Sequence, residues 1–320
     1  MLFIAMLTGF LVGGLEVVFH WQWFTPSWFL SLMIFLMLFF TFCEIDPKSL
    51  RPDKWHWMLL VFQIVVSLFI FYSLRSFDLT LAQGLMLCVL MPSAIAAPII
   101  AAKLGGSVRT LTAFTLLSSA STAVLVPLIF PLMTDVDTPF LETFLVILRH
   151  ISPVLLLPFF LAWLLRIVYN QLEQRAALKD MRDIRPFRMP EFIAQMPFYL
   201  WAGTLTILMA KMMRDIANYD GSLLVLALMF GGSLLTCMLQ FFVGKQIGEH
   251  YPSAPADEQA VRETRVSAGQ GLGQKNTTLG IWMAATYLQP LSVLAPAAYI
   301  FWQNLFNAWQ LWRVSRGKKV

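Results

Sequence analysis

Long apolar runs separated by short polar connectors repeat along the whole chain. Each run is close to the ~20 residues that a helix needs to cross the ~30 Å hydrocarbon core of a bilayer. The pattern predicts about ten helical spans, at residues 2–19, 27–44, 55–74, 79–102, 108–133, 144–169, 191–213, 221–244, 266–288 and 291–312. We therefore expect an all-α polytopic membrane protein.

Two of these spans carry residues that interrupt a helix. The fourth contains Leu90-Met-Pro-Ser-Ala-Ile-Ala-Ala-Pro98, and the ninth contains Gly269-Gln-Gly-Leu-Gly-Gln-Lys-Asn-Thr-Thr-Leu-Gly280. Pro92 and Pro98 lack an amide donor, and glycines let a backbone unwind at little cost. Irregular backbone at membrane depth is tolerated only where it is buried in protein or lines a cavity. Interrupted spans in corresponding positions of two halves indicate the binding site of a secondary transporter.

The order of the spans predicts two repeats of five helices. Because each repeat has an odd number of spans, the second is inverted relative to the first. Residues 1–170 hold the first repeat together with the sixth span, residues 171–190 form a polar cytoplasmic connector, and residues 191–320 hold the remainder of the second repeat. The interrupted fourth and ninth spans correspond to each other under this symmetry.

Composition and charge agree with a membrane location. Hydrophobic residues make up 58% of the 320 positions and charged residues 13%, against about 45–50% and about 25% in soluble domains. Most of the 23 lysines and arginines fall in connectors on one side, while Arg75, Arg149, Lys211 and Arg214 fall on the other and Lys275 lies inside the ninth span. The positive-inside rule then places both termini in the cytoplasm. This topology accounts for the net charge of +5, so we expect no nucleic-acid partner.

Several short motifs resemble the bile acid:sodium symporter family, which comprises ten-helix carriers with a core domain and a panel domain. The resemblance rests on Met91-Pro92 with the small residues after it, on Ser118-Ser-Ala-Ser-Thr122 followed by Pro127, and on Gly273-Gln-Lys-Asn276. It implies a sodium/proton antiporter-like fold in which the broken helices 4 and 9 cross. It also implies a panel of helices 1, 2, 6 and 7, a core of helices 3–5 and 8–10, and a location in the bacterial inner (plasma) membrane.

The chain departs from the family pattern at both interrupted spans. The family's ninth helix reads Glu-x-Gly-x-Gln-Asn, and the matching positions here are Gly271, Gly273, Lys275 and Asn276. The fourth-helix pattern, Cys-Pro-Gly-Gly-x-x-Ser-Asn, falls on Met91, Pro92, Ser93, Ala94, Ala97 and Pro98. The charge of the ninth helix has changed sign, and two oxygen donors of the fourth are missing. By resemblance, Gln63 and Thr115 are the remaining candidate sodium ligands, whereas an oxygen-rich cation site needs several donors at once.

Lys275 is the residue on which the functional hypothesis depends. Charged residues inside spans are functional candidates because burying a charge in hydrocarbon is expensive. A buried lysine changes its protonation readily, so we expect its ammonium to take the charge role of the absent sodium and to couple transport to protons. The alternative is a side chain that reaches the cytoplasmic interface along its apolar stem.

The other polar residues near the breaks have two interpretations. Gln274, Asn276 and Thr277 could contact substrate, or they could satisfy backbone groups that the break leaves without partners. Ser118 and the hydroxyl residues after it could face the crossing, or they could pack helices against one another.

Together these features predict a secondary active transporter that moves a small, carboxylate-bearing organic anion by alternating access. The coupling ion is sodium or, in keeping with Lys275, the proton. The anion and the lipid bilayer are the expected partners, and a homodimer is left open. The chain has neither an HExxH nor a GxSxG motif, and its three cysteines are scattered singly, so we expect no enzyme, no cofactor and no metal centre. A proton-coupled cation exchanger and a non-transporting receptor or scaffold with a carrier fold stay open as alternatives.

Overall fold

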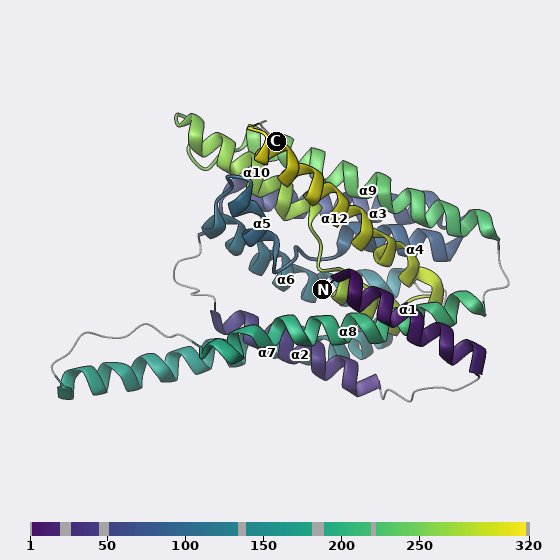
Figure 1. Cartoon of the computed structure of the whole chain (residues 1–320), viewed down its shortest axis with the longest axis horizontal. Helices are drawn as coiled ribbons and strands as arrows, with labels where there is room; N and C mark the ends of the chain where they lie inside the picture. Colours follow the sequence, from purple (N-terminus) through teal and green to yellow (C-terminus); the bar gives the residue numbers. More distant parts are fainter. Residues whose placement is uncertain are drawn as a thin grey trace.

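A computed structural model describes residues 2–19, 27–44, 51–133, 139–180, 189–218 and 222–317 of the chain (Figure 1). Within these ranges every regular element is a helix, and an isolated antiparallel bridge joins Ser93 to Lys275. The elements are α1 (Leu2–Phe19), α2 (Ser27–Glu44), α3 (Lys54–Leu74), α4 (Leu79–Leu90), α5 (Ala97–Lys103), α6 (Val108–Ile129), η2 (Phe130–Leu132), α7 (Phe140–Asp180), α8 (Glu191–Ala217), α9 (Leu223–His250), α10 (Glu258–Gly273), α11 (Thr277–Tyr287), η3 (Pro290–Val293) and α12 (Leu294–Ser315).

The helices match the expected spans, and the fourth and ninth spans are each divided in two. Residues 91–96 separate α4 from α5, and residues 274–276 separate α10 from α11. Four stretches of the described chain are long and apolar enough to cross a membrane, namely Lys54–Leu74, Val108–Leu132, Glu191–Arg214 and Leu223–His250. Shorter apolar helices cover Leu7–Phe19, Trp28–Cys43 and Leu79–Leu90. The described chain therefore agrees with a helical membrane protein.

Three helices extend beyond their apolar spans, which corrects one expected boundary of each. α7 continues to Asp180, into the expected polar connector, and residues 181–188 of that connector lie outside the described part of the chain. α9 continues to His250, and α10 already begins at Glu258, in a segment that the hydropathy pattern leaves polar. Hydropathy marks the stretch that suits hydrocarbon, whereas Glu, Gln, Arg and Ala continue a helix into water because they favour helical backbone.

The helices form two layers (Figure 1). α1, α2, α7 and α8 pack on one another in the first layer, and α3 to α6 with α9 to α12 form the second. The main contacts between the layers join α6 and η2 to α7, and α11 and η3 to α8. These connecting segments lie near the helix ends farthest from the start of α10.

Close helix packing stiffens the first layer. A Cβ atom on Gly9 or Gly13 would come within 2.5 Å of a backbone carbonyl oxygen of α8, so only glycine allows this approach of α1 to α8. The four-residue spacing is typical of small residues at membrane helix interfaces. One turn further along α1, Glu16 is 4% exposed and forms an ion pair with Arg214 of α8. α1 and α8 are therefore joined by both packing and charge.

Candidate functional site

The residues of the two breaks pair with each other through backbone hydrogen bonds. The amide of Ala94 donates to Gln274 O, and the amide of Asn276 donates to Pro92 O, each at 2.8 Å. The two bridge residues between these bonds are 0% and 1% exposed. The fourth and ninth spans therefore meet at one buried crossing.

Side chains from four other segments cover the carbonyl end of α4. The last carbonyls of a helix have no partner within the helix, so in a buried position they need outside donors. These donors are Gln240 Nε2 to Cys88 O (3.1 Å), Gln63 Nε2 to Val89 O (3.3 Å) and Met91 O (3.0 Å), Lys275 Nζ to Val89 O (2.9 Å), and Thr122 Oγ1 to Leu90 O (3.5 Å). The negative end of the α4 dipole thus meets N–H and O–H donors that the protein itself supplies.

Lys275 brings the only side chain with a formal positive charge to this group of donors. It is 1% exposed, and its Nζ donates to Val89 O instead of reaching the surface, which excludes the snorkelling alternative. No carboxylate of the described residues lies within ion-pair distance of Nζ. The carbonyl end of α4 and its helix dipole are thus the groups that would balance the charge of a protonated Lys275.

Side chains of α12 hold the backbone of the ninth-span break. Lys275 N donates to Gln303 Oε1 at 2.9 Å, and Gln303 Nε2 donates to Lys275 O at 3.4 Å. One turn earlier, Tyr299 Oη donates to Gly273 O at 2.8 Å and accepts from Gln240 Nε2 at 3.0 Å. The sequence interpretation missed all three of these supporting side chains. A signal was present, because polar residues one turn apart inside an apolar helix indicate a buried polar face.

Candidates from the fourth and fifth spans meet at the same crossing. Ser93 N donates to Ser118 Oγ at 3.1 Å, and the hydroxyl oxygens of Thr115 and Ser93 lie 3.4 Å apart. Ser118 is fully buried, so it both packs between helices and contacts the broken segment. The two interpretations of the fifth-span hydroxyls therefore hold together at this residue.

The two candidate sodium ligands use their polar groups as donors. Gln63 donates to the α4 carbonyls, and Thr115 donates to Leu111 O at 2.9 Å. Among the described residues, no group of three His, Cys, Asp or Glu side chains could hold a metal ion, and the three cysteines are free and buried. Both candidate ligands thus donate to backbone carbonyl oxygens.

Asn276, Thr277 and Pro98 belong to the starts of the two second half-helices. Asn276 Oδ1 accepts from Leu279 N at 3.2 Å, which is the usual role of an N-cap asparagine. The buried Thr277 donates through its amide to Lys275 O at 2.9 Å. Pro98 is buried in the first turn of α5, where its missing amide proton costs no helical hydrogen bond.

The glycines of the ninth span do not unwind the helix, contrary to the expectation from sequence. α10 continues through Gly273, and the break begins at Gln274. A Cβ atom at Gly271 would lie 2.8 Å from the ring of Phe114, and one at Gly273 would overlap the ring of Phe241. These glycines therefore serve close packing, and the irregular backbone follows them.

Besides Oε1 of Gln240, four buried polar atoms near the crossing lack a hydrogen-bond partner. They are both amide atoms of Gln270, Oε1 of Gln274 and Oγ1 of Thr278. The three residues are 1%, 7% and 1% exposed and follow one another at four-residue intervals. Buried polar groups in native proteins are nearly always paired, so these atoms indicate a place for a polar ligand. Gln270 was not among the sequence candidates, although its position one turn before Gln274 was visible in the sequence.

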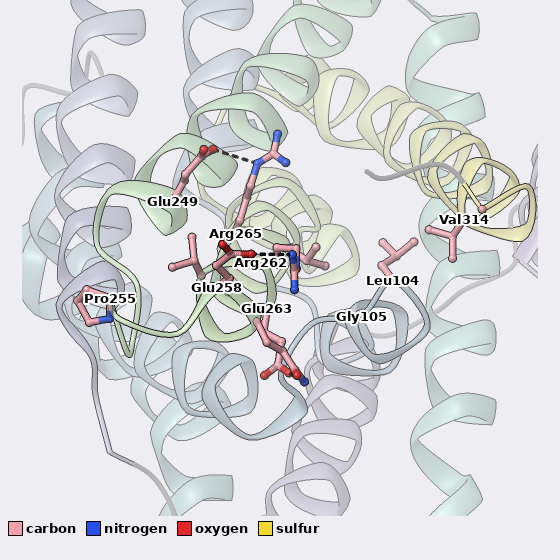
Figure 2. A pocket seen from close by; sticks show the side chains of 13 residues that line it. Leu104, Gly105, Glu249, Pro255, Glu258, Arg262, Glu263, Arg265 and Val314 are labelled. Atoms are coloured by element: carbon pink, nitrogen blue, oxygen red, sulfur yellow. Dashed lines mark hydrogen bonds and ion pairs between the residues drawn. The ribbon is translucent and has the colours of Figure 1, made fainter.

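A pocket of about 780 Å³ lies at the end of the second layer where α10 starts (Figure 2). It is lined by the turn after α5, the ends of α9 and α12 and the first turns of α10. Arg265 pairs with Glu249 at 3.1 Å, and Arg262 pairs with Glu258 at 3.6 Å. No residue of either break lines this pocket, so it is distinct from the crossing.

Comparison with known proteins adds no assignment. No protein-family model matches the chain, and no curated protein sequence matches it. The case for a function therefore rests on the geometry of the crossing.

Proposed function

We propose that this protein is a secondary active transporter for a small, carboxylate-bearing organic anion, with an architecture similar to that of the bile acid:sodium symporter family. The observation that carries the proposal is the buried pairing of two helix breaks beside an ammonium group on the carbonyl end of α4. Discontinuous helices that meet in this way form the binding sites of many secondary transporters. The matching order of α4–α5 and α10–α11 supports two inverted repeats, α1 to α6 and α7 to α12.

In this proposal the two layers are the two moving parts. The first layer, α1, α2, α7 and α8, is the panel, and the second layer is the core that carries the crossing. Lys211 Nζ of α8 donates to Ala285 O of α11 at 3.3 Å, which joins panel to core near one end of the molecule. The core moves against the panel, and the crossing opens to one side of the membrane at a time.

The substrate anion binds next to the break in the ninth span. The unpaired amide of Gln270 offers N–H donors, and the start of α11 contributes the positive end of a helix dipole. Oε1 of Gln274 and Oγ1 of Thr278 are the further unpaired atoms at this place. This arrangement favours a small anion with additional polar groups.

Lys275 takes the place of a coupling cation. With Lys275 protonated, the bound anion and the ammonium form a neutral load, which lowers the cost of exposing the site to a low-dielectric path. After the anion leaves, the ammonium gives its proton to water on the open side. One anion and one proton have then crossed together. Transport by this route needs a proton and no sodium.

The test combines ligand binding and uptake by the purified protein. Acetate, benzoate and cholate serve as probes of increasing size, because a ligand that binds only the folded state raises the melting temperature. The stabilising probe is then used for uptake into proteoliposomes in sodium chloride and in choline chloride across a pH series. We expect equal uptake in both salts and a pH dependence that is lost in Lys275→Gln. Lys103→Gln, at an exposed lysine at the end of α5, is the matched control.

Each outcome of this experiment separates the alternatives. Saturable stabilisation by sodium would restore sodium coupling and overturn the role of Lys275. Uptake by Lys275→Gln with an unchanged pH profile would overturn it as well. Stabilisation by a probe without uptake under any gradient would favour a receptor with a carrier fold.

A proton-coupled cation exchanger fits the structure less well. Such a carrier needs a carboxylate at the crossing to hold its cation. The buried carboxylate of Glu16 lies in the first layer and is paired with Arg214. The described residues of the crossing place an ammonium where the exchanger needs a negative charge.

A further inference from the structure

Three cations lie over three aromatic rings at the C-terminal end of α12. The pairs are Lys245 Nζ over Phe306 (6.0 Å to the ring centroid), Arg313 Cζ over Trp309 (5.2 Å) and Arg316 Cζ over Trp312 (4.4 Å). Each arginine follows its ring by four residues, with Arg316 directly after the end of α12, whereas Lys245 comes from α9. Stacking on a ring holds a guanidinium in one orientation while leaving its N–H donors available.

The rings continue an exposed apolar face of α12. Phe301, Leu305, Trp309 and Trp312 are 39%, 54%, 43% and 48% exposed and repeat at three- or four-residue intervals. In a membrane protein such a face lies against lipid, and tryptophan settles at the level of the headgroups. The C-terminal end of α12 lies beside the start of α10, since both line the pocket of Figure 2. The positive-inside rule assigns this end to the cytoplasmic leaflet.

Positive charge exceeds negative charge around these rings. Arg265 of α10 and Arg313 both lie close enough to Lys245 to repel its ammonium. Glu249 is paired with Arg265, Glu258 is paired with Arg262, and Glu263 accepts from Gln259 Nε2 at 2.8 Å. No carboxylate of the described residues lies within ion-pair distance of Lys245, Arg313 or Arg316. Like charges gathered at a membrane interface are stabilised by an anion.

We propose that the end of α12 binds the headgroup of an anionic phospholipid. Arg313 and Arg316 hold the phosphate from the ring faces of Trp309 and Trp312, and Lys245 adds a third charge. The acyl chains lie along the apolar face that begins at Phe301. A lipid headgroup fits this place better than a free anion, because the arginines lie over rings that belong to the lipid-facing surface of α12. The site is independent of the crossing and of any transported substrate.

Lipid retention tests this proposal directly. The full chain is purified in detergent with a mixture of phosphatidylglycerol and phosphatidylcholine, and bound lipid is counted by native mass spectrometry. The wild type should retain phosphatidylglycerol in preference to phosphatidylcholine, and Arg313→Gln/Arg316→Gln should lose this preference by about tenfold. Arg75→Gln is the matched control. Arg75 also lies over a ring, that of Tyr72 at 5.6 Å, but it follows the C-terminal end of α3, which the positive-inside rule assigns to the outer side.

The remaining outcomes contradict the binding of an anionic phospholipid, except where a failure to fold calls for a second variant. Equal retention of the two lipids by the wild type contradicts it, and so does an equal loss in the double variant and in Arg75→Gln. If inorganic phosphate raises the melting temperature of the wild type but not of the double variant, without any preference for phosphatidylglycerol, the site holds a free anion. Should the double variant fail to fold, Arg316→Gln alone decides, because Arg316 is exposed and lies beyond the helix.

Discussion

Gly273 sets the distance between α9 and α10 at the crossing. The Phe241 ring occupies the space that any side chain at position 273 would need. Overpacking of this kind costs about 1–3 kcal/mol, so we expect Gly273→Ala to lower the melting temperature and Phe241→Leu to restore part of the loss. Gly231→Ala, where no atom lies within 4 Å of the added Cβ, is the control and should not lower the melting temperature, because alanine favours helical backbone over glycine. An equal loss of melting temperature in both variants would show that packing against the Phe241 ring is not the reason for glycine at position 273.

Lys275 illustrates what the sequence can predict at the scale of a residue. A charge in the middle of an apolar span stands out from composition alone, because hydrocarbon disfavours it. Its partner, the Val89 carbonyl, lies 186 residues away in the chain and is available only because α4 ends there. Gln303 was missed for the same reason, since its contact with the Lys275 backbone exists only once α12 has packed behind the break. Local pattern indicates which residues are costly to bury, and tertiary packing decides what they bind.

At the scale of elements, the positions of the helices and of both breaks could be predicted, while their causes could be predicted only in part. Pro92 lies within the break at residues 91–96 and Pro98 in the first turn of α5, as expected of a residue that restricts the one before it and lacks a donor. The break after α10 falls beyond the glycines, where Gln274 and Asn276 exchange backbone hydrogen bonds with the other break. That position is set by the partner segment and leaves no local signature. The polar ends of α7, α9 and α10 were missed because hydropathy does not report helix propensity.

The hydrogen bond from Lys211 to Ala285 O joins α8 to the end of α11, and we expect it to hold the two layers together at that end. Lys211→Met keeps the apolar stem and removes the donor. A hydrogen bond from a charged group contributes about 1.5–3 kcal/mol, so its loss should raise the population that is open there by about tenfold or more. The measurement is the rate at which a membrane-impermeant maleimide labels Ala285→Cys from outside the cell. Lys211→Arg should label like the parent, and equal rates in all three proteins would exclude a closing role for this contact.

At the scale of the whole molecule, the contacts between the two layers lie near one end. α11, η2 and η3 meet the first layer near one end of the molecule, and the basic helix ends and the pocket of Figure 2 lie at the other. By the positive-inside rule, the described conformation is joined at its outer end, and under the proposed function this is the conformation that opens to the cytoplasm. Composition predicts an orientation of the chain, but not which end is joined, because that depends on the packing of segments from both halves.

Orientation is therefore the prediction on which this picture of the molecule depends. Ser76 lies exposed between α3 and α4, and Ala256 lies exposed between α9 and α10, so the two positions are predicted to face opposite sides of the membrane. The native cysteines are buried, which keeps background labelling low. In intact cells an impermeant maleimide should label Ser76→Cys and leave Ala256→Cys unlabelled until the membrane is opened. The reverse pattern would mean the opposite membrane orientation. The Lys211 contact would then close the cytoplasmic end, and the cations of α12 would lie at the outer leaflet. Labelling of both positions from one side would mean that an even number of membrane crossings separates them, which would contradict the inverted repeat.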